Sequence, residues 1–237
     1  HRFNFLQYEI ERTPGAGQLI MNIVALLSTV IDAAGGRVGQ QGSSENAFWQ
    51  KSMKEALMHS LSVLWAAYGR LNLFDVFSLL QSRPMIPAQA AEASWQKSSF
   101  MAATLMKAET APVHPMSPLD YRSAFKYLTV TLANPDSRTT GNIIATISAD
   151  LAPLMQGKMR ELFCTGTTLL PEQTHEGAII VLDFPLKLYA EAGVLAQHIF
   201  KFLWQRSVER REVRKRTRPV FCFADEYHFF ASPYDAE

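Results

Sequence analysis

The sequence predicts an α/β protein in which part of a parallel sheet follows a mostly helical region. Two runs of consecutive apolar residues, 178–185 and 220–226, are typical of strands buried on both faces. A segment with helical periodicity, 186–211, lies between them, so the three together form one β–α–β unit. From about residue 45 to residue 134, apolar residues instead recur every three or four positions, which predicts helices.

The composition fits a folded chain and excludes several classes. Of 237 residues, 48% are hydrophobic and 19% charged, so the chain can bury a core and is not intrinsically disordered. There are 23 Lys and Arg against 22 Asp and Glu, so no strong overall field attracts nucleic acid or anionic lipid. Cys164 and Cys222 are too few for a disulfide framework or a four-cysteine zinc site.

The first predicted part covers residues 1–44. Residues 1–12 have the mixed composition of a loop, and Gly15–Ala34 carries apolar residues at helical spacing up to a stop at Gly35 and Gly36. Residues 37–44 have loop composition. The sequence begins without a Met and without a signal sequence, so we expect the chain to be part of a longer protein.

The second predicted part, residues 45–134, is a helical domain. The sequence offers clear helix boundaries here, because Gly, Asn, Ser and Pro occupy the positions that end or begin helices. We expect a helix that ends at Gly69, a short helix capped by Asn72, a helix over 88–107 and a helix from Pro118, capped by Ser117, to Ala133.

The third predicted part, residues 135–237, contains the β–α–β unit and the strongest chemical motif. Five apolar residues run into Asp225 and Glu226, which is the Walker B pattern of P-loop nucleoside triphosphatases. The carboxyl end of a parallel strand opens into the ligand crevice. A carboxylate there can hold Mg²⁺ directly or through water, and the next one can activate the attacking water. We therefore expect Asp225 to bind the metal and Glu226 to be the catalytic base.

Two further residues are candidates for the same site. Asp183 ends the other predicted strand, so it also points towards the crevice and is a candidate nucleotide-binding residue. Arg138 opens the predicted helix over 138–156, where it does not favour the helix dipole, and it is a candidate arginine finger. Ordinary structural or surface roles stay open for both.

A basic run lies between the long helix and the last strand. It consists of Arg206, Arg210, Arg211, Arg214, Lys215, Arg216 and Arg218. Such a run can contact DNA phosphates, but it also suits the solvated C-terminal end of a helix, and we favour the second interpretation.

The phosphate-binding half of a nucleotide site is missing from the sequence. The glycines of residues 35–42 have neither the spacing nor the Lys of a Walker A loop, and they follow a helix where a P-loop follows a strand. If the chain belongs to a P-loop enzyme, its phosphate loop precedes His1, and the chain by itself is inactive.

Four segments, in order, resemble the coupling proteins of type IV secretion, the TraG/TraD-like DNA-transfer ATPases related to FtsK- and HerA-type motors. The most specific is Val220–Phe230, which resembles their Walker B segment. Ala178–Pro185 is similar to the strand before it, and Phe48-Trp49 opens a helical block like the all-α insertion of that family. Arg2-Phe3-Asn4 is similar to an Arg-Phe-Asn-Pro segment, with Phe5 replacing the Pro.

The resemblance implies a RecA-like motor domain with an all-α inserted domain, ATP and Mg²⁺ as cofactors, and a membrane-anchored hexamer that moves DNA at the cytoplasmic face of the inner membrane. Its partners would be DNA, relaxosome proteins and type IV secretion components. The chain itself would be soluble, with any membrane anchor outside it. Two alternatives stay open: a helical protein-interaction module without catalysis, and another secretion P-loop ATPase that moves protein.

Overall fold

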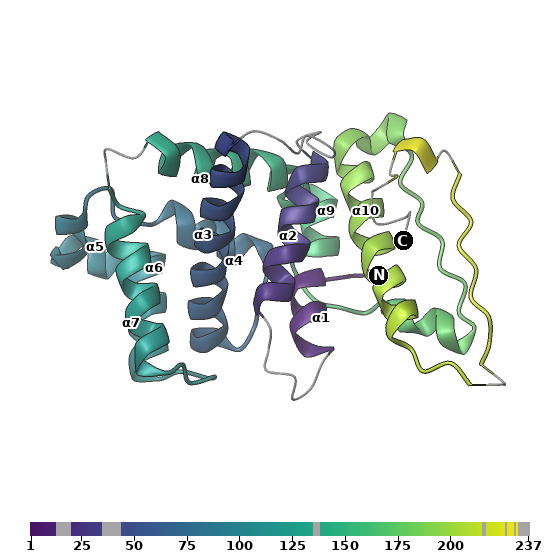
Figure 1. Cartoon of the computed structure of the whole chain (residues 1–237), viewed down its shortest axis with the longest axis horizontal. Helices are drawn as coiled ribbons and strands as arrows, with labels where there is room; N and C mark the ends of the chain where they lie inside the picture. The colour runs from purple at the N-terminus through teal and green to yellow at the C-terminus, as the bar shows by residue number, and fades with distance from the viewer. Residues whose placement is uncertain are drawn as a thin grey trace.

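The computed structural model describes residues 1–12, 20–34, 44–134, 138–214, 217–225, 227–229 and 231. Regular structure within these ranges is helical (Figure 1). The α-helices are α1 (Phe5–Glu11), α2 (Ile20–Ala34), α3 (Ser44–Tyr68), α4 (Leu73–Gln81), α5 (Ala93–Ser98), α6 (Phe100–Thr110), α7 (Pro118–Lys126), α8 (Arg138–Leu151), α9 (Gly157–Phe163) and α10 (Leu186–Arg210). Shorter turns of helix are η1 (Pro87–Ala91), η2 (Tyr127–Thr131, a π-helix), η3 (Ala152–Met155), η4 (Pro171–Glu176) and η5 (Tyr227–Phe229).

The predicted α/β class is wrong for the described part of the chain, which contains no strand or sheet and is all-α. The residues predicted as strands, 178–185 and 220–226, lie as far as Asp225 in two extended segments, 178–185 and 217–225, and no backbone hydrogen bond joins these segments. Two parallel strands with nothing to cover them do not make a stable sheet, because parallel strands need neighbours and two buried faces. The predicted strands are wrong in burial as well as in pairing, since Ile179 is 92% exposed and Phe223 is 94% exposed.

The helix between these segments is confirmed as α10, although it contains a kink. Ala190 has φ 44° and ψ −131°, so the first turn is set at an angle to the rest of the helix. Figure 1 shows both extended segments running along α10 in the same direction, from the side of η4 towards the N-terminal end of α10, beside which η5 lies. The two segments lie close together where they begin: the guanidinium group of Arg218 packs directly against Gly177.

Most predicted boundaries in the helical region are confirmed. Gly69, with φ 61°, follows the end of α3, and Oδ1 of Asn72 accepts a hydrogen bond of 2.8 Å from the amide of Asp75 to cap α4. Oγ of Ser117 accepts one of 3.0 Å from the amide of Asp120 to cap α7.

The helix expected over residues 88–107 is instead broken into η1, α5 and α6. Ser99 has an extended backbone between α5 and α6, and its hydroxyl donates a hydrogen bond of 2.7 Å to the carbonyl of Ser82. The indole of Trp95 donates to the same carbonyl at 3.1 Å. These tertiary bonds fix the break at Ser99, which helix propensity alone does not reveal.

A single large cluster of buried apolar side chains runs through the molecule. It joins α2, α3 and α4 with α8 and α10, and its fully buried members include Leu26, Leu57, Leu61 and Leu203. Burial of each such side chain contributes about 1.5–3 kcal/mol to folding. The division into parts at residues 44 and 134 stays a prediction.

The N-terminal segment is tied to a part of the chain far away in sequence. Phe3 forms an isolated antiparallel bridge with Thr167, and its amide donates to the carbonyl of Leu162 at 2.6 Å. Asn4, which is buried, caps α1 by accepting from the amide of Gln7. The Arg-Phe-Asn segment therefore forms part of the structural core of this region.

No single helix in the described ranges combines the length and apolar composition needed to cross a bilayer. The segment Phe48–Tyr68 of α3 and α4 meet those criteria only as a pair, and the two helices are bent by 111°.

Candidate functional site

The acids predicted to form a metal and nucleotide site lie at the ends of the two extended segments. Asp183 precedes the first turn of α10, and Asp225 precedes η5; both are exposed. Because the two segments run in the same direction, their acidic ends lie towards the same end of α10 (Figure 1). Both residues therefore lie at the surface of the described part of the chain.

The two predicted catalytic residues cannot be placed. Glu226 lies outside the described residues, and Arg138 begins α8 but its side chain is outside the description. The glycine-rich residues 35–42, rejected above as a phosphate loop, are also outside it.

The described residues do not by themselves form a site for ATP and Mg²⁺. A search of them finds no group of three or more His, Cys, Asp or Glu side chains that could share a metal ion. Asp183 and Asp225 could contribute to a magnesium site that takes its other ligands from water and from a phosphate. Phosphates need a cradle of backbone N–H groups and a Lys, and the described ranges contain no such loop.

The basic run is only partly a solvated helix end. Arg214 is exposed and pairs with Glu212 at 2.6 Å. Arg206 is half-buried, with its guanidinium carbon 5.0 Å from the ring centre of Phe202, and its Nη1 is buried with no hydrogen-bond partner. Burial lowers the pKa of Arg210, and the nearby charges of Arg12 and Arg206 lower it further.

A buried polar network next to these arginines was not identified from the sequence. The hydroxyl of Tyr8 donates a hydrogen bond of 2.6 Å to Glu172, and burial, with this bond, raises the pKa of Tyr8. Glu9 is buried and forms an ion pair with Arg12 one turn later. The pair lies between the apolar residues of α1, and the only sequence signal for it is an acid followed three positions later by a base. We interpret the network as structural, because its charges are already paired.

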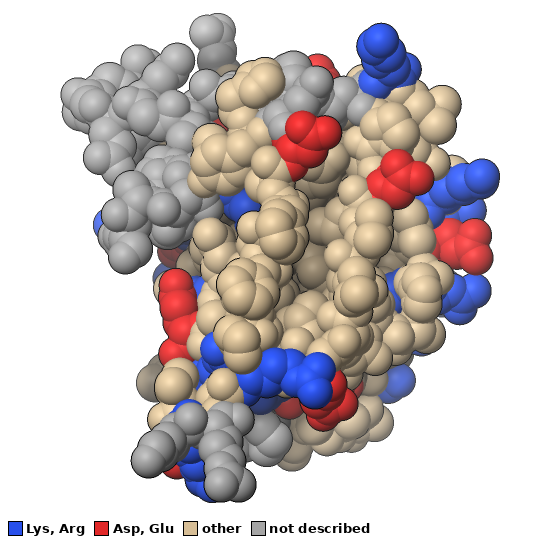
Figure 2. Space-filling model, turned by 90° about the vertical axis from the view of Figure 1, so that its right-hand side faces the viewer, with Lys and Arg blue, Asp and Glu red and all other residues tan. Residues whose placement is uncertain are grey.

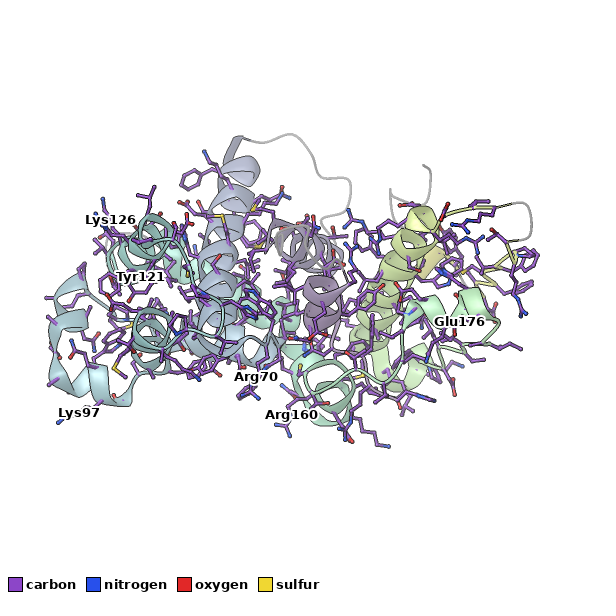
Figure 3. The ribbon with its side chains drawn as sticks, turned by 90° about the horizontal axis from the view of Figure 1, so that it is seen from below. Arg70, Lys97, Tyr121, Lys126, Arg160 and Glu176 are labelled. Atoms are coloured by element: carbon purple, nitrogen blue, oxygen red, sulfur yellow. The ribbon has the colours of Figure 1, made fainter. Side chains whose placement is uncertain are left out.

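A groove at the end of the molecule that contains α6 and α7 was also not identified from the sequence. Its volume is about 590 Å³, and it lies between α6 and α7. The hydroxyl of Tyr121 lies within 3.2 Å of Glu109, and burial, with the charge of Glu109, raises the pKa of Tyr121 to about 12. Figure 3 shows Tyr121 and Lys126 at the end of the molecule opposite to Glu176. The lining residues are Ala108, Glu109, Pro112, Pro115, Met116, Pro118, Tyr121, Arg122 and Phe125.

Comparison of the chain with models of protein families, with curated proteins and with solved structures finds no match. The resemblance to the coupling proteins therefore depends on the segments quoted above.

Proposed function

We propose that this chain is part of an ATP-driven, DNA-translocating coupling ATPase of conjugation or type IV secretion. One observation supports the proposal most. Two apolar extended segments begin together, run along α10 in the same direction, and end in the exposed acids Asp183 and Asp225. A P-loop motor has acids after the apolar strands beside its nucleotide, and here the acids follow apolar extended segments that are not paired into a sheet.

In this proposal the chain supplies only part of the site. Asp225 would hold Mg²⁺ through water, Glu226 would position the attacking water, and Asp183 would lie beside the nucleotide. Arg138 would be the arginine that a neighbouring subunit presents to the phosphates. Other polypeptide must supply the phosphate loop, since this sequence contains none.

The remaining features follow from the same proposal. The gene product would assemble as a homohexamer anchored at the cytoplasmic face of the inner membrane, with DNA, relaxosome proteins and type IV secretion components as partners. The helical region would meet the transferred DNA or the relaxosome proteins.

The test uses the full-length gene product and single-stranded or double-stranded DNA. Glu226→Gln should keep ATP binding and reduce hydrolysis by about 10²–10⁴-fold, because it removes a general base. Glu176→Gln is the matched control, since Glu176 is an exposed acid on η4 and should leave turnover unchanged (Figure 3). Unchanged turnover in Glu226→Gln would remove Glu226 from the proposed role.

The groove between α6 and α7 favours a second candidate, a helical protein-interaction module without catalysis. Prolines, Met116, Arg122 and two aromatic rings line it, and Met, Arg and aromatic side chains are enriched at protein–protein interfaces. A gene product that hydrolyses no ATP, with or without DNA, would favour this candidate. A gene product that hydrolyses ATP but does not respond to DNA would favour a secretion ATPase that moves protein.

A further inference from the structure

Both extended segments carry large apolar side chains that are exposed. On residues 178–185, Ile179 is 92% exposed and Val181 is 79% exposed. On residues 217–225, Phe221 is 75% exposed and Phe223 is 94% exposed. We call these four side chains and the backbone that carries them the outer face. Figure 2 views this end of the molecule and shows a broad area without charged side chains, hollowed along its middle, with Lys, Arg, Asp and Glu at its margins.

The alternating side chains of the first segment point inward. Ile180, Leu182 and Phe184 are partly buried and pack against the main core, and the ring centres of Phe184 and Phe163 lie 6.4 Å apart. The segment therefore has the two-residue period of a β-strand, with one apolar face already covered by the protein. An apolar outer face on such a segment is typical of a strand that is covered on both sides.

The backbone of the first extended segment is unpaired as well. Within the described part of the chain, residues 179–183 form no hydrogen bond through their amides or carbonyls. The carbonyl of Phe184 accepts one from Nε2 of Gln197 at 3.1 Å, which fixes the end of the segment against α10. Five consecutive extended residues thus present free donors and acceptors next to exposed apolar side chains.

These two properties together select the kind of partner. A helix or a lipid surface can cover apolar side chains, but a helix uses its own backbone groups internally and acyl chains have no donors. An extended polypeptide can satisfy both the backbone and the side chains, as in β-strand addition. We propose that the outer face is a docking site for an apolar β-strand from a different polypeptide segment, one outside residues 1–237.

The docking site does not depend on the proposed function, because it is argued from exposure and hydrogen bonding alone. The residues that the structure describes are all-α, and a strand pair would exist only in the complex.

The test uses a fluorescent synthetic octapeptide in which Val alternates with Thr, titrated against the whole 237-residue chain. The comparison peptide has the same side chains but carries N-methyl groups on alternate amides, so that it cannot form a strand ladder. We expect saturable binding of the first peptide only. We also expect hydrogen exchange at the amides of 179–183 to slow at least about tenfold in the complex, since exchange requires the new bonds to open.

Two substitutions and one control locate the site. Val181→Lys and Phe223→Lys place a charge on the outer face without disturbing the core, and each should weaken peptide binding about tenfold or more. Leu119→Lys is the matched control, because Leu119 is 73% exposed on α7 at the other end of the molecule. It should leave binding unchanged.

Several results would overturn the proposal. It fails if neither peptide binds, if both peptides bind equally well, or if Leu119→Lys weakens peptide binding as much as Val181→Lys does. The same holds if Val181→Lys abolishes self-association of the chain, which would assign the face to a second copy, or abolishes binding to phosphatidylcholine vesicles, which would assign it to lipid.

Discussion

The side-chain amide of Asn4 donates a hydrogen bond of 2.8 Å to the carbonyl of Leu71, joining residues 67 positions apart in the chain. The amide of Leu71 in turn donates to Oε1 of Gln7 at 2.7 Å. Leu71 lies between α3 and α4, so these bonds hold the turn of the helical region against α1. The amide of Asn4 also reaches the carbonyl of Thr165 at 3.4 Å, so one buried side chain connects three segments.

Asn4→Ala should therefore destabilise the protein by more than the loss of a helix cap alone would. The cap is worth about 1 kcal/mol, and each buried hydrogen bond adds about 1 kcal/mol, so we expect a loss of about 2–3 kcal/mol in urea unfolding. Ser117→Ala, which removes only an exposed cap from α7, should cost about 1 kcal/mol. Equal losses in the two variants would show that the Asn4 amide contributes nothing.

Removing the buried acid Glu9 should be costly. Its side chain is fully buried in an ion pair with Arg12, so Glu9→Gln removes the buried charge that faces this cation and should lower the free energy of unfolding by about 3 kcal/mol or more. Glu161→Gln breaks an exposed pair with Arg2 and should change the free energy of unfolding by less than about 1 kcal/mol. Urea titrations of both variants check this, and similar small effects would contradict the structural role assigned to the pair.

The buried imidazole of His59 should make the folded protein less stable in mild acid. Burial lowers the pKa of His59 below its ordinary value of 6.5, although Glu55 opposes the shift. The unfolded chain therefore takes up the proton at a higher pH than the folded chain does. Stability linked to His59 is fully present above about pH 6.5 and falls as the pH drops towards the lowered pKa. The urea midpoint should fall between pH 7.5 and pH 5.5, and His59→Gln should flatten this dependence; an equally steep profile in the variant would exclude His59 as its source.

The two cysteines should differ sharply in reactivity. Burial raises the pKa of the Cys164 thiol to about 11, and its sulfur contacts the carbonyl of Leu154 at 3.5 Å, whereas Cys222 is exposed on the second extended segment. Ellman's reagent at pH 8 should modify one thiol quickly and the second only after unfolding. Cys222→Ser should abolish the fast phase, and a fast phase that persists in this variant would contradict the burial of Cys164.

Most of the helices were predictable because their signals are local, but the loop expected over residues 1–12 is wrong, since Phe5–Glu11 forms α1. Asn72, Ser117 and Pro118 set boundaries through groups a few residues away, and the structure confirms them. The break at Ser99 depends on the distant carbonyl of Ser82, so no local pattern could predict it. Residues 178–185 and 217–225 show a different limit, since their composition predicts extended backbone but does not determine whether two such segments pair. For the site, the roles given to Asp183, Asp225, Glu226 and Arg138 all stay predictions.

ATP hydrolysis by the full-length gene product, measured with and without DNA, tests the proposed function most directly. We expect turnover that rises with DNA and falls at least about 10²-fold in Asp225→Asn, because the metal-binding carboxylate is lost. The isolated 237-residue chain should bind ATP weakly or not at all in calorimetry, because its sequence lacks a phosphate loop. Tight ATP binding by the isolated chain, or full DNA-stimulated turnover in Asp225→Asn, would contradict the account.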